Sequence, residues 1–197
     1  MIIRLAEGTL PTRFGTFQEV LYYDGQHESI ALLMGEIAEG QEVLCRVHSS
    51  CLAAHVFNSV ECDCREQMAL AQAVIAQEGR GLIIWLDQEG RGHGHLALIR
   101  SRALQAEGWS QTEAYRKLGY TADARDYTSA ADILRDLAVR SITLLTNSPH
   151  KVESLQAAGI RISGTHPLVV DPGTNARLRQ RYADKRQQGH HIPPAYT

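Results

Sequence analysis

The chain has 197 residues, a length that suits one α/β domain or two small lobes around a substantial core. Hydrophobic residues make up 44% and charged residues 21%, which is typical of a globular protein and excludes a disordered one. The formal net charge of -2 is spread over both halves, so we expect no nucleic-acid partner. The absence of a long apolar run and of a signal-peptide pattern leads us to expect a cytoplasmic protein without membrane contact.

Apolar segments bounded by Gly, Asp or Asn crowd the first third of the chain and alternate with helical patterns afterwards. The predicted strands are Thr16–Tyr23, Ser29–Ile37, Glu42–Val47, Gly81–Asp87, Ser141–Thr146 and Pro167–Val170. The predicted helices are Arg65–Gln77, Leu96–Ala106, Thr112–Lys117, Tyr127–Leu137 and Pro149–Ala157. This order predicts an α/β fold in which helices pack on a mixed β-sheet, with the strands concentrated in the N-terminal third.

The last part of the chain differs in composition from the rest. From Thr174 onward it is polar, and it ends close to Pro193 and Pro194. We therefore expect residues 1–173 to form one catalytic domain and residues 174–197 a loose polar tail.

Three cysteines, Cys51, Cys62 and Cys64, lie in one short stretch. Three thiolates can hold one Zn²⁺ at about 2.3 Å each and leave the fourth tetrahedral position to water, as in catalytic zinc sites. Water bound there would ionise near neutral pH and become a nucleophile. The alternative is a structural zinc closed by His48 or His55 as the fourth ligand.

Two further segments suggest sites for an anion. The glycine-rich segment from Gln88 to His95 follows a predicted strand, so its N–H groups could approach a phosphate, although such turns are common without ligands. Near Thr146, Ser148 is suited to cap a helix, and Lys151 then falls in the first turn, where a cation gains nothing from the helix dipole. A bound anion would explain Lys151; a solvated surface lysine is the alternative.

Asp123 and Arg125 lie in a segment predicted to be extended, just before a helix. Alternate residues of an extended chain point the same way, so the two side chains could converge on one substrate. A surface ion pair worth less than about 1 kcal/mol is the alternative.

Taken together, these segments resemble the GTP cyclohydrolase II family in order and in spacing. The resemblance covers roughly residues 4 to 171. Its motifs identify the family when they are taken together. The segments that carry it are Arg46–Cys51, Cys62–Cys64, Gln88–Gly92, Leu118–Asp126 and Leu145–Pro149.

The resemblance implies a zinc-dependent homodimer that also uses Mg²⁺ at the triphosphate of a purine nucleotide, GTP above all. Such an enzyme releases pyrophosphate, opens the imidazole ring at C8, expels formate and gives a diaminopyrimidinone ribosyl phosphate. Cys51, Cys62 and Cys64 would hold the zinc. Arg125 would act at the α-phosphorus with Asp123 as its proton acceptor, although a protonated guanidinium is a poor nucleophile and its role could be electrostatic.

The resemblance also implies which residues bind substrate, in these motifs and close to them. They are Arg46, Val47, His48, Ser49, Ser50, Gln67, Glu89, Gly90, Arg91, Gln111, Thr146 and Lys151. The residues expected to take part in catalysis are Asp123, Arg125, Arg102 and His93.

The chain departs from the family pattern around the base. Ser50 replaces a glutamate, His93 and His95 replace apolar residues, and Gln111 stands near the position of a threonine. Arg102 replaces the catalytic tyrosine. Because arginine only donates hydrogen bonds, it cannot pass on the proton that formate release requires, although His93 or His95 could act as the acid. We therefore expect a product that keeps its formyl group, a formamidopyrimidine nucleotide.

Two other readings stay open. The substitutions of Ser50, His93 and Gln111 could mark a specialised paralogue that acts on another nucleotide in pyrimidine catabolism or a natural-product pathway. The missing tyrosine could instead mark a catalytically silent nucleotide-binding or zinc-stabilised protein, although such descendants seldom keep an open three-thiolate site.

Overall fold

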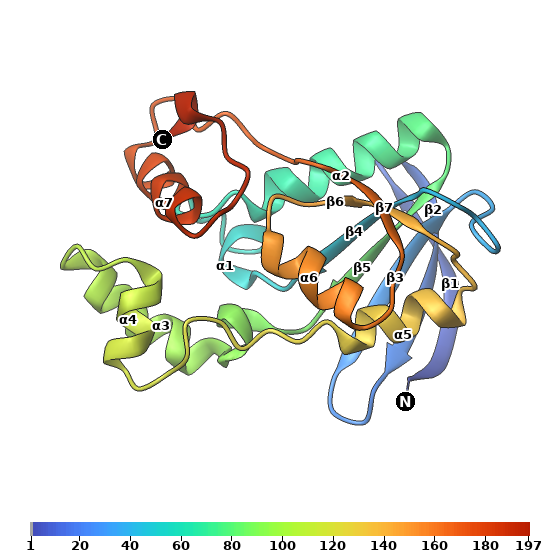
Figure 1. Ribbon diagram of the computed structural model, residues 1–197, viewed down its shortest axis with the longest axis horizontal. Helices are drawn as coiled ribbons and strands as arrows, with labels where there is room; N and C mark the ends of the chain where they lie inside the picture. The colour runs from blue at the N-terminus through green and yellow to red at the C-terminus, as the bar shows by residue number, and fades with distance from the viewer. Residues whose placement is uncertain (1) are drawn as a thin grey trace.

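The structure is a computed structural model that describes residues 2–197 as one seven-stranded sheet with helices on both faces (Figure 1). The strands are β1 (Ile3–Thr12), β2 (Gly15–Tyr23), β3 (Glu28–Met34), β4 (Val43–Ser49), β5 (Gly81–Leu86), β6 (Ile142–Leu145) and β7 (Ile162–His166). The helices are α1 (Leu52–His55), α2 (Cys64–Glu78), α3 (Gly94–Ala106), α4 (Gln111–Lys117), α5 (Thr128–Asp136), α6 (Pro149–Ala157) and α7 (Ala176–Gln187), with 3₁₀ turns at Glu89–Gly92 and Pro194–Tyr196.

The strand order is β1-β2-β3-β5-β4-β6-β7, and the sheet is antiparallel in one half and parallel in the other. The antiparallel half contains β1, β2, β3 and β5. Short hairpins join β1 to β2 and β2 to β3, and β3 pairs with β5. β5, β4, β6 and β7 pair parallel and are joined by helical crossovers. This arrangement confirms the predicted mixed α/β sheet.

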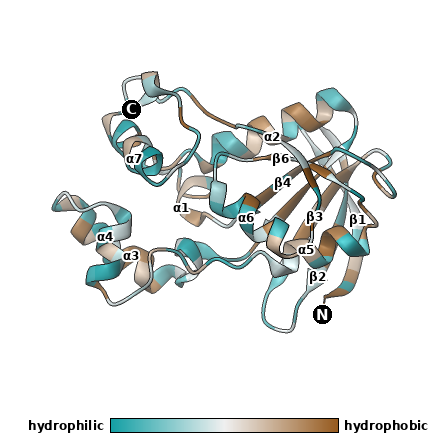
Figure 2. Ribbon diagram, viewed as in Figure 1, coloured by the Kyte–Doolittle hydropathy of each residue, from teal (hydrophilic) through white to brown (hydrophobic). Residues whose placement is uncertain are grey.

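Strand β5 shows why the sheet needs cover on both sides. Its successive side chains point to opposite faces, so Ile83 joins a core with Ala71 and Ile75 of α2, whereas Leu82 and Ile84 join the larger core on the other face. The larger core includes residues of α5 and α6. Figure 2 shows hydrophobic colour concentrated on the central strands, which agrees with their burial between two helical layers.

Some boundaries differ from the predicted ones. The sequence pattern missed β1, whose residues are mostly exposed on both faces and therefore show no alternation of polar and apolar side chains. The strand predicted over Pro167–Val170 lies earlier, at Ile162–His166, because Pro167 has no N–H for a sheet ladder.

The expectation of a loose tail is corrected by the structure. Residues 176–187 form helix α7, which begins with Asn175 accepting a hydrogen bond from the Leu178 N–H at 3.1 Å. Leu178 and Tyr182, one turn apart, are buried with Ile192 in a small core of their own. None of the helices within residues 2–197 is both long enough and apolar enough to cross a membrane.

Candidate active site

The carboxyl ends of the parallel strands β4, β5 and β6 meet at one edge of the sheet. At this edge, the connection from β4 to β5 crosses one face of the sheet through α2, and the connection from β5 to β6 crosses the other face through α5. Clefts at such points are the common ligand sites of α/β sheets. The loop after β4 carries Cys51, the turn after β5 carries Glu89 and Arg91, and the loop after β6 leads to Lys151. All of these residues line one cavity.

The cavity contains the three cysteines that the sequence singled out. Their Sγ atoms all lie within 4.8 Å of one another, with Cys62 and Cys64 only 3.0 Å apart. A tetrahedral site with bonds of about 2.3 Å would place sulfurs about 3.8 Å apart, so a small shift lets the cluster hold zinc. Among residues 2–197 this is the one such cluster of potential ligands, and it includes neither His48 nor His55. The donor set therefore fits a site with one open position.

The ionisation of the thiols depends on their mutual contact. Hydrogen bonding from Cys51 and Cys64 holds the pKa of the Cys62 thiol well below its ordinary value. The bond to Cys62 raises the pKa of Cys51 to about 11. Negative charge thus concentrates on one sulfur, and a bound cation would be needed to stabilise all three as thiolates.

A chain of buried hydrogen bonds leads away from the cysteines. Asp63, between Cys62 and Cys64, accepts a bond of 2.5 Å from Nε2 of Gln67. The Oε1 atom of Gln67 accepts a bond of 2.7 Å from Nη2 of Arg46, and Nη1 of Arg46 donates to the Leu145 carbonyl at 2.9 Å. Gln67 and Arg46 are therefore held in fixed orientations on the cavity wall.

Lys151 is buried, contrary to the surface alternative. Only 5% of it is exposed, and its Nζ donates to the Val47 carbonyl at 2.5 Å. Burial, with the nearby charges of Arg46 and Arg125, lowers the pKa of Lys151 well below its ordinary value. Val47 itself lies in the core, so it contributes its backbone alone.

The loop before Lys151 offers further polar groups. Ser148 is the residue at the start of α6, but its hydroxyl makes no capping bond. Instead, the Ser148 N–H donates to the Thr146 hydroxyl at 3.1 Å, and the Ser148 Oγ is buried without a partner. An anion could use both hydroxyls and the start of the helix.

The glycine-rich turn holds neighbouring segments together. One carboxylate oxygen of Glu89 accepts the Leu52 N–H at 2.7 Å and so anchors the loop that follows Cys51. Arg91 donates to the Thr112 hydroxyl and the Ala122 carbonyl, and burial lowers its pKa to about 10. Gly92 has φ +84°, and a Cβ there would come within 2.7 Å of the Ala124 carbonyl oxygen. The turn needs glycine at that position to accept this close approach.

Asp123 and Arg125 converge as their spacing predicts. Nε of Arg125 donates to Oδ1 of Asp123 at 2.9 Å, and both residues line the cavity. Burial alone would lower the pKa of Arg125, but the bond to Asp123 holds it above the ordinary value. The guanidinium is therefore protonated, which favours an electrostatic role over a nucleophilic one.

The other expected residues fall into two groups. Arg102, His48, Ser49, Ser50, Gly90, Gln111 and Thr146 line the cavity. His93 does not: its Nε2 lies 2.9 Å from the Thr121 carbonyl, and its ring packs against Tyr115 and Tyr120. This geometry gives no support to His93 as a proton donor. His95 lines a separate cavity, with Asp24 and Asp126.

Unsatisfied polar atoms mark the same cavity. Residues 2–197 contain seven buried side-chain nitrogen or oxygen atoms without a hydrogen-bond partner. Five of them belong to residues that line the cavity. These atoms are Arg46 Nε, His48 Nε2, Ser50 Oγ, Asn147 Oδ1 and Ser148 Oγ. Because buried polar groups are almost always paired, their concentration here indicates a polar ligand.

Several cavity residues were absent from the sequence prediction. Asn147 and Ser148 lie inside a predicted motif, whereas Arg181, Lys185 and His190 belong to the tail that was expected to be loose. The Asn175 cap and the apolar residues Leu178 and Tyr182 at helical spacing were the available signal for that helix.

Comparison with known proteins identifies the family. The family model described as GTP cyclohydrolase II matches residues 3–167. This chain belongs to the GTP cyclohydrolase II family. It is 43% identical over 195 residues to GTP cyclohydrolase-2 of Actinobacillus succinogenes, covering 97% of this chain and 88% of that protein. The protein is therefore a GTP cyclohydrolase II-type hydrolase, as the motifs predict.

Other relatives place this GTP cyclohydrolase II domain inside larger proteins. The riboflavin biosynthesis protein RibBA of Bacillus cereus is 46% identical over 170 residues, which cover 85% of this chain and 43% of that protein. Among solved structures, RibBX, a two-domain 3,4-dihydroxy-2-butanone 4-phosphate synthase from A. baumannii, matches with a TM-score of 0.48 and 21% identity over 86% of this chain and 40% of its own. That likeness is too weak to support an argument.

Proposed function

We propose that this protein is a zinc-dependent hydrolase that opens the imidazole ring of GTP at C8 and releases pyrophosphate in the riboflavin pathway. One observation carries the proposal: the three cysteine sulfurs lie within 4.8 Å of one another in a cavity that also contains Arg46, Arg125 and Lys151. A nucleophile-generating metal and a cluster of cations in one cavity suit a nucleotide triphosphate.

In this proposal Cys51, Cys62 and Cys64 hold the zinc. Zinc, when bound, lowers the pKa of water so that water attacks carbon near neutral pH. Gln67, fixed by Asp63 and Arg46, orients the base beside the metal.

The phosphates would lie against the cations of the cavity. Lys151, buried beside the Val47 carbonyl, and Arg46 would neutralise phosphate charge. Thr146 and Ser148 would donate their hydroxyls. Arg125, held by Asp123, would stabilise charge at the α-phosphate. Mg²⁺ would accompany the triphosphate.

Arg102 decides which product is released. It lines the cavity, and its guanidinium has no hydrogen-bond or ion-pair partner within residues 2–197. A guanidinium can stabilise an oxyanion but cannot deliver a proton to a departing amine. The proposed main product therefore keeps its formyl group, as a formamidopyrimidine ribosyl phosphate, and formate release is slow.

The test is incubation of zinc-loaded protein with GTP and Mg²⁺. We expect pyrophosphate and the ultraviolet change of imidazole opening. A protein with one zinc per chain that gives neither would have a different substrate. A thermal-shift panel of nucleoside triphosphates identifies it: a strong preference for an adenine or pyrimidine nucleotide would favour the specialised paralogue.

The oligomeric state and the location also belong to this proposal. Near the cysteines, the side chains of Val56, Phe57 and Val60 are 59%, 70% and 68% exposed. An apolar surface of this kind supports a homodimer, which sedimentation velocity would test, with a monomer at micromolar concentration as the contrary result. We propose a cytoplasmic location, where reduced thiols are preserved.

A further inference from the structure

The C-terminal segment, residues 174–197, lies beyond the family match at residues 3–167 but reaches the same cavity. In Figure 1, α7 lies above α3 and α4 at the same end of the molecule. The segment provides part of the cavity lining. Its lining residues are Arg181, Lys185, Gln188, His190 and Ile192.

The segment is attached to the loop that carries two of the cysteines. Nδ2 of Asn175 donates to the Val60 carbonyl at 2.7 Å, and Nη1 of Arg181 donates to the Glu61 carbonyl at 3.1 Å. At its other end, the His191 N–H donates to the Asn147 carbonyl at 2.9 Å. The segment therefore joins the cysteine loop to the loop after β6.

Tyr182 acts on the residue between the two cysteines. Its hydroxyl donates to Oδ2 of Asp63 at 2.7 Å, and Nζ of Lys185 lies 3.3 Å from Oδ1. Asp63 is 1% exposed and also binds Gln67. Because both carboxylate oxygens are used, α7 determines how Asp63 is oriented and, through it, how the Cys62–Cys64 loop and Gln67 are placed.

Arg181 forms its side-chain hydrogen bonds with neutral groups, although the cysteine thiols and Asp63 lie near it. Nη2 donates to Oε1 of Gln111 on α4 at 3.2 Å, and Nη1 donates to the Glu61 carbonyl. Both acceptors are neutral, and Arg181 makes no ion pair with a carboxylate within residues 2–197. A guanidinium next to the cysteines whose hydrogen-bond acceptors are all neutral is suited to bind an electron-rich ligand.

We propose that residues 174–197 form one wall of the nucleotide pocket, in which Arg181 binds the guanine edge and Tyr182 positions the cysteine loop through Asp63. The inference rests on the proposed function. Arg181 binds the Glu61 carbonyl next to Cys62, whereas Lys151 binds the Val47 carbonyl. Guanine presents two acceptors, O6 and N7, that a guanidinium can bind.

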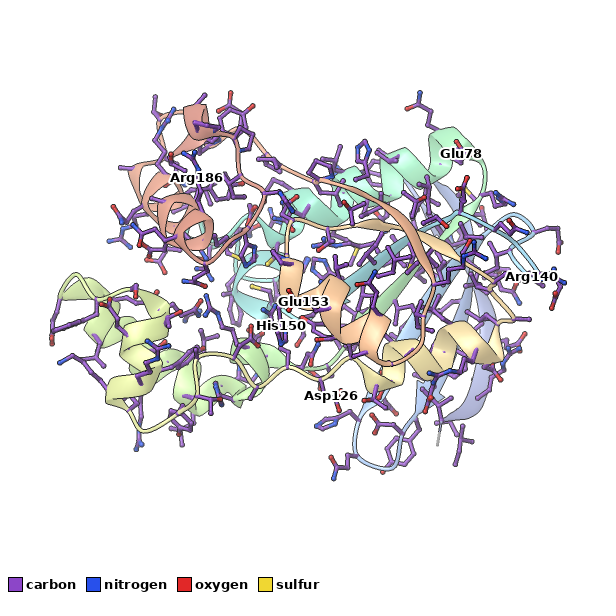
Figure 3. The ribbon with its side chains drawn as sticks, viewed as in Figure 1. Glu78, Asp126, Arg140, His150, Glu153 and Arg186 are labelled. Atoms are coloured by element: carbon purple, nitrogen blue, oxygen red, sulfur yellow. The ribbon has the colours of Figure 1, made fainter. Side chains whose placement is uncertain are left out.

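The test of Arg181 is calorimetric binding of GTP and of inorganic tripolyphosphate to the full-length zinc-loaded protein. Arg181→Met should weaken GTP binding by about tenfold or more and leave tripolyphosphate binding within about twofold. Arg186, labelled in Figure 3, is exposed on the same helix, so Arg186→Met is the matched control and should change neither. The assignment would be overturned if Arg181→Met weakened the binding of GTP and of tripolyphosphate equally, or did not weaken the binding of GTP. If Arg181→Met does not fold, Arg181→Lys replaces it, with a smaller loss expected for GTP alone.

Tyr182→Phe tests the positioning role, with Tyr196→Phe as the control in the same segment. We expect Tyr182→Phe to lose zinc to a chelator about fivefold faster or more and to lower kcat with KM for GTP unchanged. Chelation kinetics identical to the wild type would refute this role. A wild-type protein without GTP turnover would refute the proposed reaction, but the binding and chelation comparisons would still decide the roles of Arg181 and Tyr182.

Discussion

The ammonium nitrogen of Lys151 lies 2.5 Å from the carbonyl oxygen of Val47, at a position where only 5% of the lysine is exposed. Burial and the charges of Arg46 and Arg125 lower the pKa of Lys151. A phosphate bound beside it would act in the opposite direction and raise that pKa.

Nucleotide binding is therefore expected to take up a proton at Lys151. Affinity should rise as the pH falls through the window between the bound and free pKa values, and level off below the free value. Titration calorimetry in two buffers of different ionisation enthalpy measures the uptake. Lys151→Met should abolish it and weaken binding by about tenfold, or about 1.4 kcal/mol. The control, a change of the exposed Lys117 to Met, should preserve both the proton uptake and the affinity. Unchanged proton uptake in Lys151→Met would contradict the prediction.

Cys62→Ser should give a folded protein that lacks zinc and activity, because a hydroxyl is a poor replacement for a thiolate ligand. Metal analysis and circular dichroism measure the two properties. Cys45 lies in the larger core, and burial raises its pKa to about 12, so it serves as the control. Cys45→Ala should keep the zinc and lose about 1 kcal/mol of stability. Unfolding of Cys62→Ser would instead indicate a structural zinc.

Arg125→Lys should reduce kcat by about tenfold or more, since lysine keeps the charge but loses the planar fork that binds Asp123. Because the guanidinium is protonated, intact-mass spectrometry during turnover should detect no covalent nucleotide adduct on the wild type. Arg140, labelled in Figure 3, pairs with Glu39 far from the cavity and is exposed. Arg140→Lys should leave kcat unchanged. A trapped adduct on Arg125 would restore the nucleophilic role.

Arg102→Tyr should increase the ratio of formate to pyrophosphate, because a phenol can pass on the proton that the second hydrolysis needs. Enzymatic formate assay and mass spectrometry of the nucleotide product measure it. Arg100 lies on the same helix, is exposed and does not line the cavity, so Arg100→Tyr is the control. Stoichiometric formate from the unmodified protein would show that formate release does not need the tyrosine.

Acid should destabilise the protein partly through His190. Burial, with Lys185 and neighbouring arginines, lowers the pKa of His190 from 6.5 to about 4. The unfolded chain therefore binds this proton first, and stability falls as the pH drops from 6.5 towards 4. In His190→Gln, the free energy of unfolding should fall by about 2 kcal/mol less over this pH range. This figure is smaller than the full pKa shift implies, because part of the ring is in contact with solvent. Denaturant unfolding at several pH values measures this. The control is His191→Gln, at the exposed neighbouring residue, which should lose stability with falling pH as steeply as the wild type.

Much of the site was predictable because its residues lie in short segments with strong local signals. Three cysteines in one stretch specify a metal site through their chemistry alone, and the alternation of Asp123 and Arg125 correctly places both side chains together. The apolar runs of β4, β5 and β6 identified the parallel strands whose carboxyl ends carry these segments.

The amino-acid sequence by itself determined the central strands, the cysteine cluster and the order of the cation-bearing loops, because each depends on neighbouring residues. Only the tertiary structure decided the role of residues 174–197, since the burial of Tyr182 against Asp63 joins positions far apart in the chain. It also decided that Lys151 is buried and that His93 packs against Tyr115 and Tyr120 outside the cavity. A local pattern specifies an element, but the partner that an element packs against depends on the whole chain.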